Sequence, residues 1–148
     1  MSKQKSKGTR LETALVRYAR GRTGDESIDR VALHGNSDMG DVGGLRARGR
    51  SGIAECKNYR ITTKKGTVAP SLLRRWQDET ERERENSGSD FALLVIHRPG
   101  CSDRDHEAES FGRNWCWLTG ASYEAITGEP HEEGWFQSTV SEVFDLMG

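Results

Sequence analysis

An unbroken apolar run at residues 91–96 (FALLVI) is the feature that most restricts how this chain can fold. A strand with alternating polar and apolar residues keeps one face for water, but this run has no polar face. Both of its faces must therefore be covered by other parts of the chain. The run predicts a central strand in a sheet with helices packed against it.

The patterns around that run predict an α/β fold, in which a mixed β-sheet core is flanked by helices in a single domain over residues 1–148. The expected elements are a helix at 9–21, strands at 25–34, 41–48 and 52–59, a helix at 70–86, the strand at 91–96, a charged loop at 98–113, a strand at 114–118, a helix at 121–127 and a last helix from 139 onward.

The sequence predicts different structures for the two ends of the chain. Residues 1–7 are polar and basic, which is typical of a flexible arm. Thr9 and Glu12 have the spacing of a capping box, which would give Glu12 a purely structural role. The last helix has an apolar stripe that predicts either a core contact or a dimer surface.

Charge is divided unevenly along the chain. Residues 1–75 carry 17 Lys/Arg against 7 Asp/Glu, whereas residues 103–148 carry 2 against 10. Such a division can place a basic face beside an acidic remainder, and the basic half then predicts a polyanionic partner such as nucleic acid. The alternative is surface charge unrelated to any partner.

Cysteine usage and hydropathy indicate the compartment. Cys56, Cys101 and Cys116 are an odd number at wide spacing, which favours reduced thiols, and a zinc site from Cys101, His106 and Cys116 would lack any CxxC or HxxxH pair. No apolar run approaches the roughly 18 residues that span a bilayer, and residues 1–7 lack a signal-peptide core. We expect a soluble cytoplasmic protein with no membrane partner, in the host cytoplasm if it is viral.

Two carboxylates and a lysine converge in the expected hairpin of residues 41–59. Glu55 and Lys57 lie two apart on one strand, so their side chains share a face while Cys56 points to the other. If the strands pair through a turn at 46–50, Asp41 lies beside Glu55. Oxygen ligands of this kind suit a hard divalent cation, and a nearby Lys can offset phosphate charge or orient a water. A charged hairpin with ordinary cross-strand pairs is the alternative.

The order of these residues resembles the PD-(D/E)XK nuclease superfamily. A helix with Glu12 precedes Gly40-Asp41, which stands for the Pro-Asp element, and Glu55-Cys56-Lys57 stands for the (D/E)XK element. The chain is most similar to archaeal-type Holliday junction resolvases and their bacteriophage relatives, over residues 7–60 well and over 61–97 loosely. The cues for that subgroup are Lys7-Gly8, Leu11-Glu12, Arg30 and Gly35-Asn36-Ser37. Two departures are Gly40 in place of Pro and Thr13 where those resolvases often have Arg.

The resemblance implies a restriction-endonuclease-like fold and metal-dependent hydrolysis of DNA to a 5′-phosphate and a 3′-hydroxyl. Asp41, Glu55 and the backbone carbonyl of Cys56 would hold Mg²⁺ or Mn²⁺. Lys57 would orient or help deprotonate the attacking water and offset transition-state charge. Glu12 would hold a second metal or a metal-bound water. The expected catalytic set is Glu12, Asp41, Glu55 and Lys57.

The expected DNA contacts are basic side chains on the hairpin and its flanks. They are Lys7, Arg10, Arg30, Arg46, Arg48, Arg50, Arg60, Lys64 and Lys65. Asp38 and Gln77 are weaker site candidates, and Ser37 is expected to be a turn residue. His34, His97, His106 and His131 occur singly, which argues against a histidine-based metal site.

These expectations together describe a structure-specific endonuclease. We expect a homodimer that nicks four-way DNA junctions symmetrically, because a two-fold dimer presents two equivalent sites to two equivalent strands. The alternatives are an exonuclease, a restriction-type or nicking endonuclease, or a DNA-binding module that does not cleave. The presence of all three carboxylates and Lys57 argues against the last of these.

Overall fold

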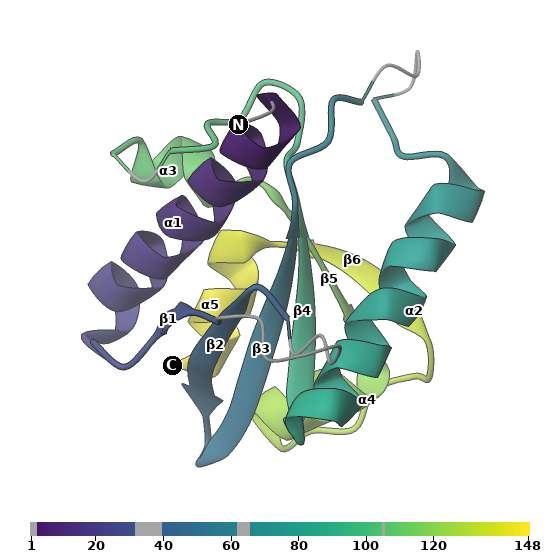
Figure 1. Ribbon diagram of the computed structural model, residues 1–148. Coiled ribbons are helices and arrows are strands. Elements are labelled where there is room, and N and C mark those ends of the chain that lie inside the picture. The colour runs from purple at the N-terminus through teal and green to yellow at the C-terminus, as the bar shows by residue number, and fades with distance from the viewer. Residues whose placement is uncertain (1–2, 32–39, 62–65, 105) are drawn as a thin grey trace.

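The computed structural model describes residues 3–31, 40–61, 66–104 and 106–148, and side chains from residue 8 onward within these ranges. It contains a six-stranded sheet in which the strands follow chain order, with helices on its faces (Figure 1). The strands are β1 (Asp29–Arg30), β2 (Val42–Ala47), β3 (Arg50–Lys57), β4 (Phe91–Ile96), β5 (Trp115–Thr119) and β6 (Trp135–Thr139). The helices are α1 (Lys3–Thr23), α2 (Pro70–Ser87), α3 (Ala108–Phe111), α4 (Gly120–Thr127) and α5 (Val140–Met147).

The sheet is mixed, as the sequence predicts. Among the described strands only β3 and β4 run parallel, and every other neighbouring pair is antiparallel. A parallel pair cannot be closed by a tight turn, so the chain crosses over through α2, which begins at Pro70 in the first helical turn, where proline is tolerated. The resulting order around the parallel pair is a helix, three strands, a helix and a strand.

Both faces of β4 are covered, which confirms its central place in the sheet. Leu93 and Val95 belong to the large core formed with α1, α4 and α5, whereas Leu94 and Ile96 pack with Trp76 of α2 on the other face. Figure 1 shows α1 and α2 on opposite sides of the sheet. The expected strand at 91–96 and the expected helix at 70–86 agree with β4 and α2 to within a residue.

The C-terminal part of the fold differs from the expectation by one strand and one short helix. Strand β6 was not among the expected elements, because no alternation is visible in its sequence, and no position in it is fully buried in the structure. It is an edge strand that is held by antiparallel pairing with β5. Helix α3 is a single turn inside the expected loop at 98–113. The apolar stripe of α5 packs into the core through Val140, Val143 and Phe144.

The first helix begins earlier than expected. Residues 3–7, expected as a flexible arm, lie in α1, which continues through Gly8 and Gly21 to Thr23. A buried stripe that includes Leu11, Leu15 and Ala19 anchors the helix to the core and outweighs the cost of its glycines. Thr9 therefore lies inside the helix, so the predicted capping box is wrong and Glu12 is not a capping residue.

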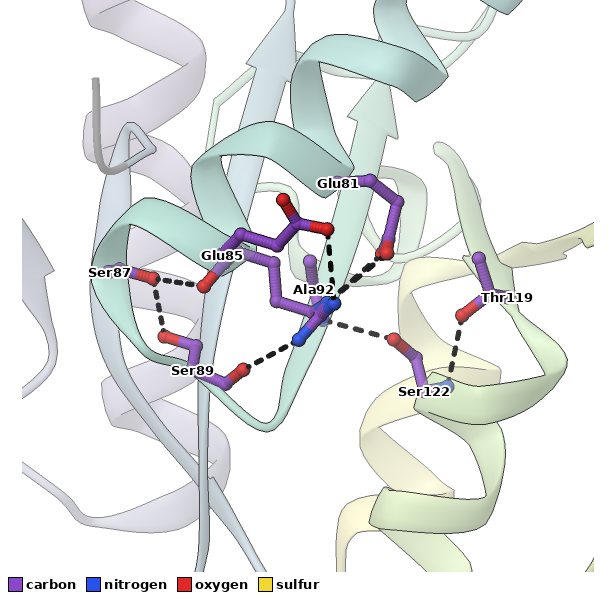
Figure 2. Close-up of polar contacts among 8 residues, drawn as sticks. Glu81, Glu85, Ser87, Ser89, Ala92, Thr119 and Ser122 are labelled. Atoms are coloured by element: carbon purple, nitrogen blue, oxygen red, sulfur yellow. Dashed lines mark hydrogen bonds and ion pairs between the residues drawn. The ribbon is translucent and has the colours of Figure 1, made fainter. Parts of the chain in front are cut away.

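Polar contacts fix the return of the chain from α2 into β4 (Figure 2). Gly88 ends α2 in a left-handed conformation with φ of 69°, and the hydroxyls of Ser87 and Ser89 lie 2.8 Å apart. On the other side of β4, Ser122 accepts a hydrogen bond from the backbone N–H of Ala92 at 3.1 Å. The pairing of β4 with β5 begins only at Leu94, so Ser122 satisfies an N–H beyond the end of that ladder.

No helix among the described residues is both long enough and apolar enough to cross a lipid bilayer.

Candidate active site

Asp41 is fixed at the head of β2 by contacts with β3. Its backbone N–H donates to the carbonyl of Ala54 at 3.0 Å, and its carboxylate accepts from the N–H of Cys56 at 2.8 Å. Gly40 before it has φ of +93°, a conformation closed to proline, whose ring holds φ near −65°. The Gly40 departure from the Pro-Asp element therefore follows from the backbone conformation that places Asp41.

Glu55 and Lys57 lie on the face of β3 that α2 covers. Glu55 is only 5% exposed, and the Lys57 ammonium lies 3.5 Å from its carboxylate. Cys56 points to the opposite face, where its thiol packs into the core that includes α1 residues. The alternation that the sequence predicts along this strand is therefore present, and it brings Asp41, Glu55 and Lys57 to one place.

Glu12 approaches the Asp41 carboxylate from α1. Its Oε2 accepts a hydrogen bond from Arg30 Nε at 3.1 Å and forms an ion pair with Arg30 Nη2 at 3.0 Å. Burial and the neighbouring Asp41 carboxylate raise the pKa of Glu12 to about 7, against a smaller opposing effect of Arg30. Arg30, predicted as a DNA contact, is thus a partner of Glu12 in this structure.

Two further carboxylates come from α2, and the sequence reasoning missed both. Glu79 accepts a hydrogen bond from Lys57 at 3.1 Å, and Glu83, which is 3% exposed, is hydrogen-bonded to Glu55. The run 78–85 is nearly all charged, a pattern typical of a helix that faces solvent. The sequence signal that part of this run is buried was Trp76. A buried Trp76 brings positions three, four and seven residues later onto the same helix face. Thr80 and Glu83 are buried with it.

The electrostatics of this cluster are dominated by buried carboxyl groups. Burial, then hydrogen bonding to Glu83 and the Asp41 charge, raise the pKa of Glu55 to about 12. Burial lowers the pKa of the Lys57 ammonium, but Glu55 and Glu79 outweigh it, so this pKa is raised. Carboxyls packed this closely favour protonation or a bound cation, since like charges at short range cannot all ionise without compensation.

The donor atoms suit a hard divalent cation. They are carboxylate oxygens, which Mg²⁺ and Mn²⁺ prefer, and Glu55 Oε2 is buried with no hydrogen-bond partner among the described residues. No three His, Cys, Asp or Glu side chains in the described part of the chain are already arranged around a common centre. Binding an ion here therefore requires side-chain rotation in the cluster, in which Glu12, Asp41 and Glu79 are less buried than Glu55 and Glu83.

The predicted DNA contacts fall into two groups. Arg46, Arg48 and Arg50 surround the β2–β3 turn, whereas Lys57 ends β3, so a strand length of roughly 20 Å separates them from the cluster. They therefore do not lie beside the cluster, and their contact with DNA stays a prediction. The Arg48 guanidinium lies against Gly128 after α4. Arg60 and Arg10 are at the same end of β3 as Lys57, and they line one hollow.

The remaining predicted residues have varied outcomes. Gln77 was a weaker site candidate, and it has no hydrogen bond to Glu55 or Lys57 among the described contacts. The α2 residue that contacts Lys57 is Glu79. His34, Ser37, Asp38, Lys64 and Lys65, for which the sequence made predictions, lie outside the described residues, as does the side chain of Lys7.

Comparison of the chain with protein-family models, with curated proteins and with solved structures finds no match. The arguments for function therefore come from the chain's own residues and from the motif order described above.

Proposed function

We propose that this protein is a divalent-metal-dependent DNA endonuclease with a restriction-endonuclease-like core. The observation that carries the proposal is the contact of Asp41 with β3. The Asp41 carboxylate accepts a hydrogen bond from the backbone N–H of Cys56, the residue between Glu55 and Lys57. The helix, three strands, helix and strand around this contact follow the order on which the PD-(D/E)XK resemblance rests. The parallel pairing of β3 and β4 through α2 supports the same assignment.

The roles of the residues follow from their positions. Asp41 and Glu55 would hold Mg²⁺ or Mn²⁺ with the carbonyl of Cys56, and Glu12 would add a ligand or bind a coordinated water. When bound, such an ion supplies an activated water and neutralises phosphate charge. The ammonium of Lys57 would donate to a phosphate oxygen or to that water, since it is held beside Glu55.

The proposed substrate is branched DNA, with four-way junctions as the first candidate. The products would be a 5′-phosphate and a 3′-hydroxyl. A homodimer would provide two equivalent sites for paired nicks. An exonuclease or a restriction-type or nicking endonuclease would act on other DNA substrates with the same cluster. A DNA-binding module that does not cleave would use the basic residues alone.

Cleavage assays on labelled four-way, flap, linear duplex and single-stranded DNA test the proposal. We expect paired symmetric nicks in the junction that need Mg²⁺ or Mn²⁺ and are lost in Glu55→Gln and Lys57→Ala. Glu85→Gln is the matched control, because Glu85 is an exposed carboxylate on α2 beside Arg84. Cleavage that survives Glu55→Gln would overturn the assigned site, and DNA binding without cleavage under either ion would favour the binding module.

A further inference from the structure

Two adjoining hollows lie beside the cluster, near the N-terminal half of α1. The first has a volume of about 460 Å³, within the size range of ligand sites, and its lining includes Arg10, Asn58, Tyr59, Arg60, His97 and Asp103. The second, of about 230 Å³, is lined on its basic side by Arg10, Arg17, Arg104 and His106. Arg10 belongs to both, so the two hollows form one continuous surface.

The lining of this surface is basic. Four arginines contribute to it, and among the described residues Asp103 is the only acidic side chain in either hollow. Asp103 holds Arg10 through two nitrogens, at 2.9 and 2.8 Å, and also accepts from the Asn58 amide at 3.1 Å. This contact offsets one positive charge and orients the Arg10 guanidinium, whose five N–H groups exceed what one carboxylate uses. Together with Arg60 and Arg104, this guanidinium suits a chain of phosphates.

Tyr59 adds an aromatic surface to the first hollow. Its side chain is 45% exposed, which is unusual for a large ring in this structure. Its ring meets the Trp76 ring edge-to-face, at 5.4 Å between centroids and 72° between planes. In that geometry Trp76 covers at most one face of Tyr59, so the other face is available for stacking. Aromatic rings beside cationic side chains are the usual means of binding unpaired bases.

The position of Tyr59 connects this surface to the cluster. Tyr59 follows Lys57 by two residues, which is about 7 Å of extended chain. A strand with one phosphate at Lys57 would therefore bring a neighbouring nucleotide to the first hollow. The arginines of the second hollow then lie farther along α1 and the loop before α3.

We propose that the two hollows bind an unpaired DNA strand next to the cleaved bond, with one base stacked on Tyr59 and the backbone held by Arg10, Arg60 and Arg104. This inference rests on the proposed function and specifies its substrate: the DNA must offer unpaired nucleotides beside the scissile phosphate. An already single-stranded nucleotide beside a branch point, as in a flap, satisfies this requirement at the lowest cost, because no base pair has to be broken.

Binding of a short labelled oligothymidylate in the presence of a chelator tests the inference without requiring cleavage. We expect Tyr59→Ala to weaken binding about tenfold and Tyr59→Phe to retain it, since stacking needs the ring and not the hydroxyl. Arg104→Ala should reduce the slope of log affinity against log salt by about 0.7, the loss of one phosphate contact. Arg113→Ala is the control, because Arg113 is exposed but lines neither hollow. Equal binding by wild type, Tyr59→Ala and Arg104→Ala would overturn the inference.

Cleavage of branched DNA by the same variants separates the two proposals. If Glu55→Gln abolishes cleavage while Tyr59→Ala binds and cleaves as wild type, the nuclease assignment stands and the strand site is wrong. If the wild type cleaves no DNA but binds oligothymidylate through Tyr59, the nuclease assignment is wrong and the strand site stands. Loss of both binding and branched-DNA cleavage in Tyr59→Ala, with Tyr59→Phe unaffected, supports both.

Discussion

The carboxylate of Glu79 lies 3.1 Å from the ammonium of Lys57, which is closer than the 3.5 Å between Lys57 and Glu55. The same ammonium lies 5.8 Å from the centre of the Trp76 ring. Trp76 and Glu79 are one helical turn apart, so a single face of α2 fixes the position of Lys57. Helix α2 is therefore part of the candidate site as well as a cover for the sheet.

We predict that Glu79→Gln slows cleavage by about tenfold with little change in DNA affinity, because a charge-assisted hydrogen bond that orients Lys57 is replaced by a weaker neutral one. Single-turnover rates and binding constants separate the two effects. Glu79→Asp should recover part of the rate if orientation is the cause. Glu81→Gln, which alters another α2 carboxylate that pairs with Arg84, is the matched control. An unchanged rate in Glu79→Gln would contradict a positioning role.

We predict that Ser122→Ala lowers the free energy of unfolding by about 1–3 kcal/mol, because the buried N–H of Ala92 loses its acceptor. Chemical denaturation measures this change. Ser138→Ala removes an exposed hydroxyl that contacts Glu142, and it should change stability far less. The site lies elsewhere on the sheet, so Ser122→Ala should retain cleavage below its unfolding midpoint. Equal effects of the two substitutions would show that another group satisfies the Ala92 N–H.

The fold was predictable where apolar periodicity is strong. The run that becomes β4 has no polar face, and the helix that begins at Pro70 has both a start signal and an apolar first half. Strand β6 was not predictable because its stability comes from pairing with β5 and not from burial of its own residues. The length of α1 was misjudged because a buried stripe carries the helix through two glycines that usually mark ends.

The candidate site was predictable as far as it lies on one strand. The two-residue spacing of Glu55 and Lys57 determines that they share a face, and pairing with β2 brings Asp41 to them. The contribution of Glu79 and Glu83 depends on how α2 is rotated over the sheet. That rotation is set by tertiary packing of Trp76, and apart from this tryptophan the charged run after it gives no sign of which face is buried.

We predict that the ion pair between Asp103 and Arg10 makes stability depend on pH in the acid range. Burial alone would raise the Asp103 pKa, but hydrogen bonds from Asn58 and Arg10 outweigh it and hold the pKa below its usual value. The pKa of Asp103 is therefore lower in the folded protein than in the unfolded chain. The resulting stability is fully present at pH values above the unfolded-state pKa, and it is lost as the pH falls through the folded-state pKa. At neutral pH the free energy of unfolding of wild type should exceed that of Asp103→Asn by about 1 kcal/mol. The difference should disappear in acid, and a constant difference would contradict this origin.

Metal binding to the cluster should be visible as a change in stability, independently of any cleavage. A cation that binds the folded cluster and not the unfolded chain should stabilise the folded state. We predict that Mg²⁺ or Mn²⁺ at about 100 times its Kd stabilises wild type by about 2.7 kcal/mol, measured as a rise in Tm over the protein in chelator. Glu55→Gln and Asp41→Asn should lose most of that rise, whereas Glu85→Gln should keep it. A rise of the same size in Glu55→Gln and Asp41→Asn would place the ion elsewhere, because neither change leaves the proposed oxygen ligands intact.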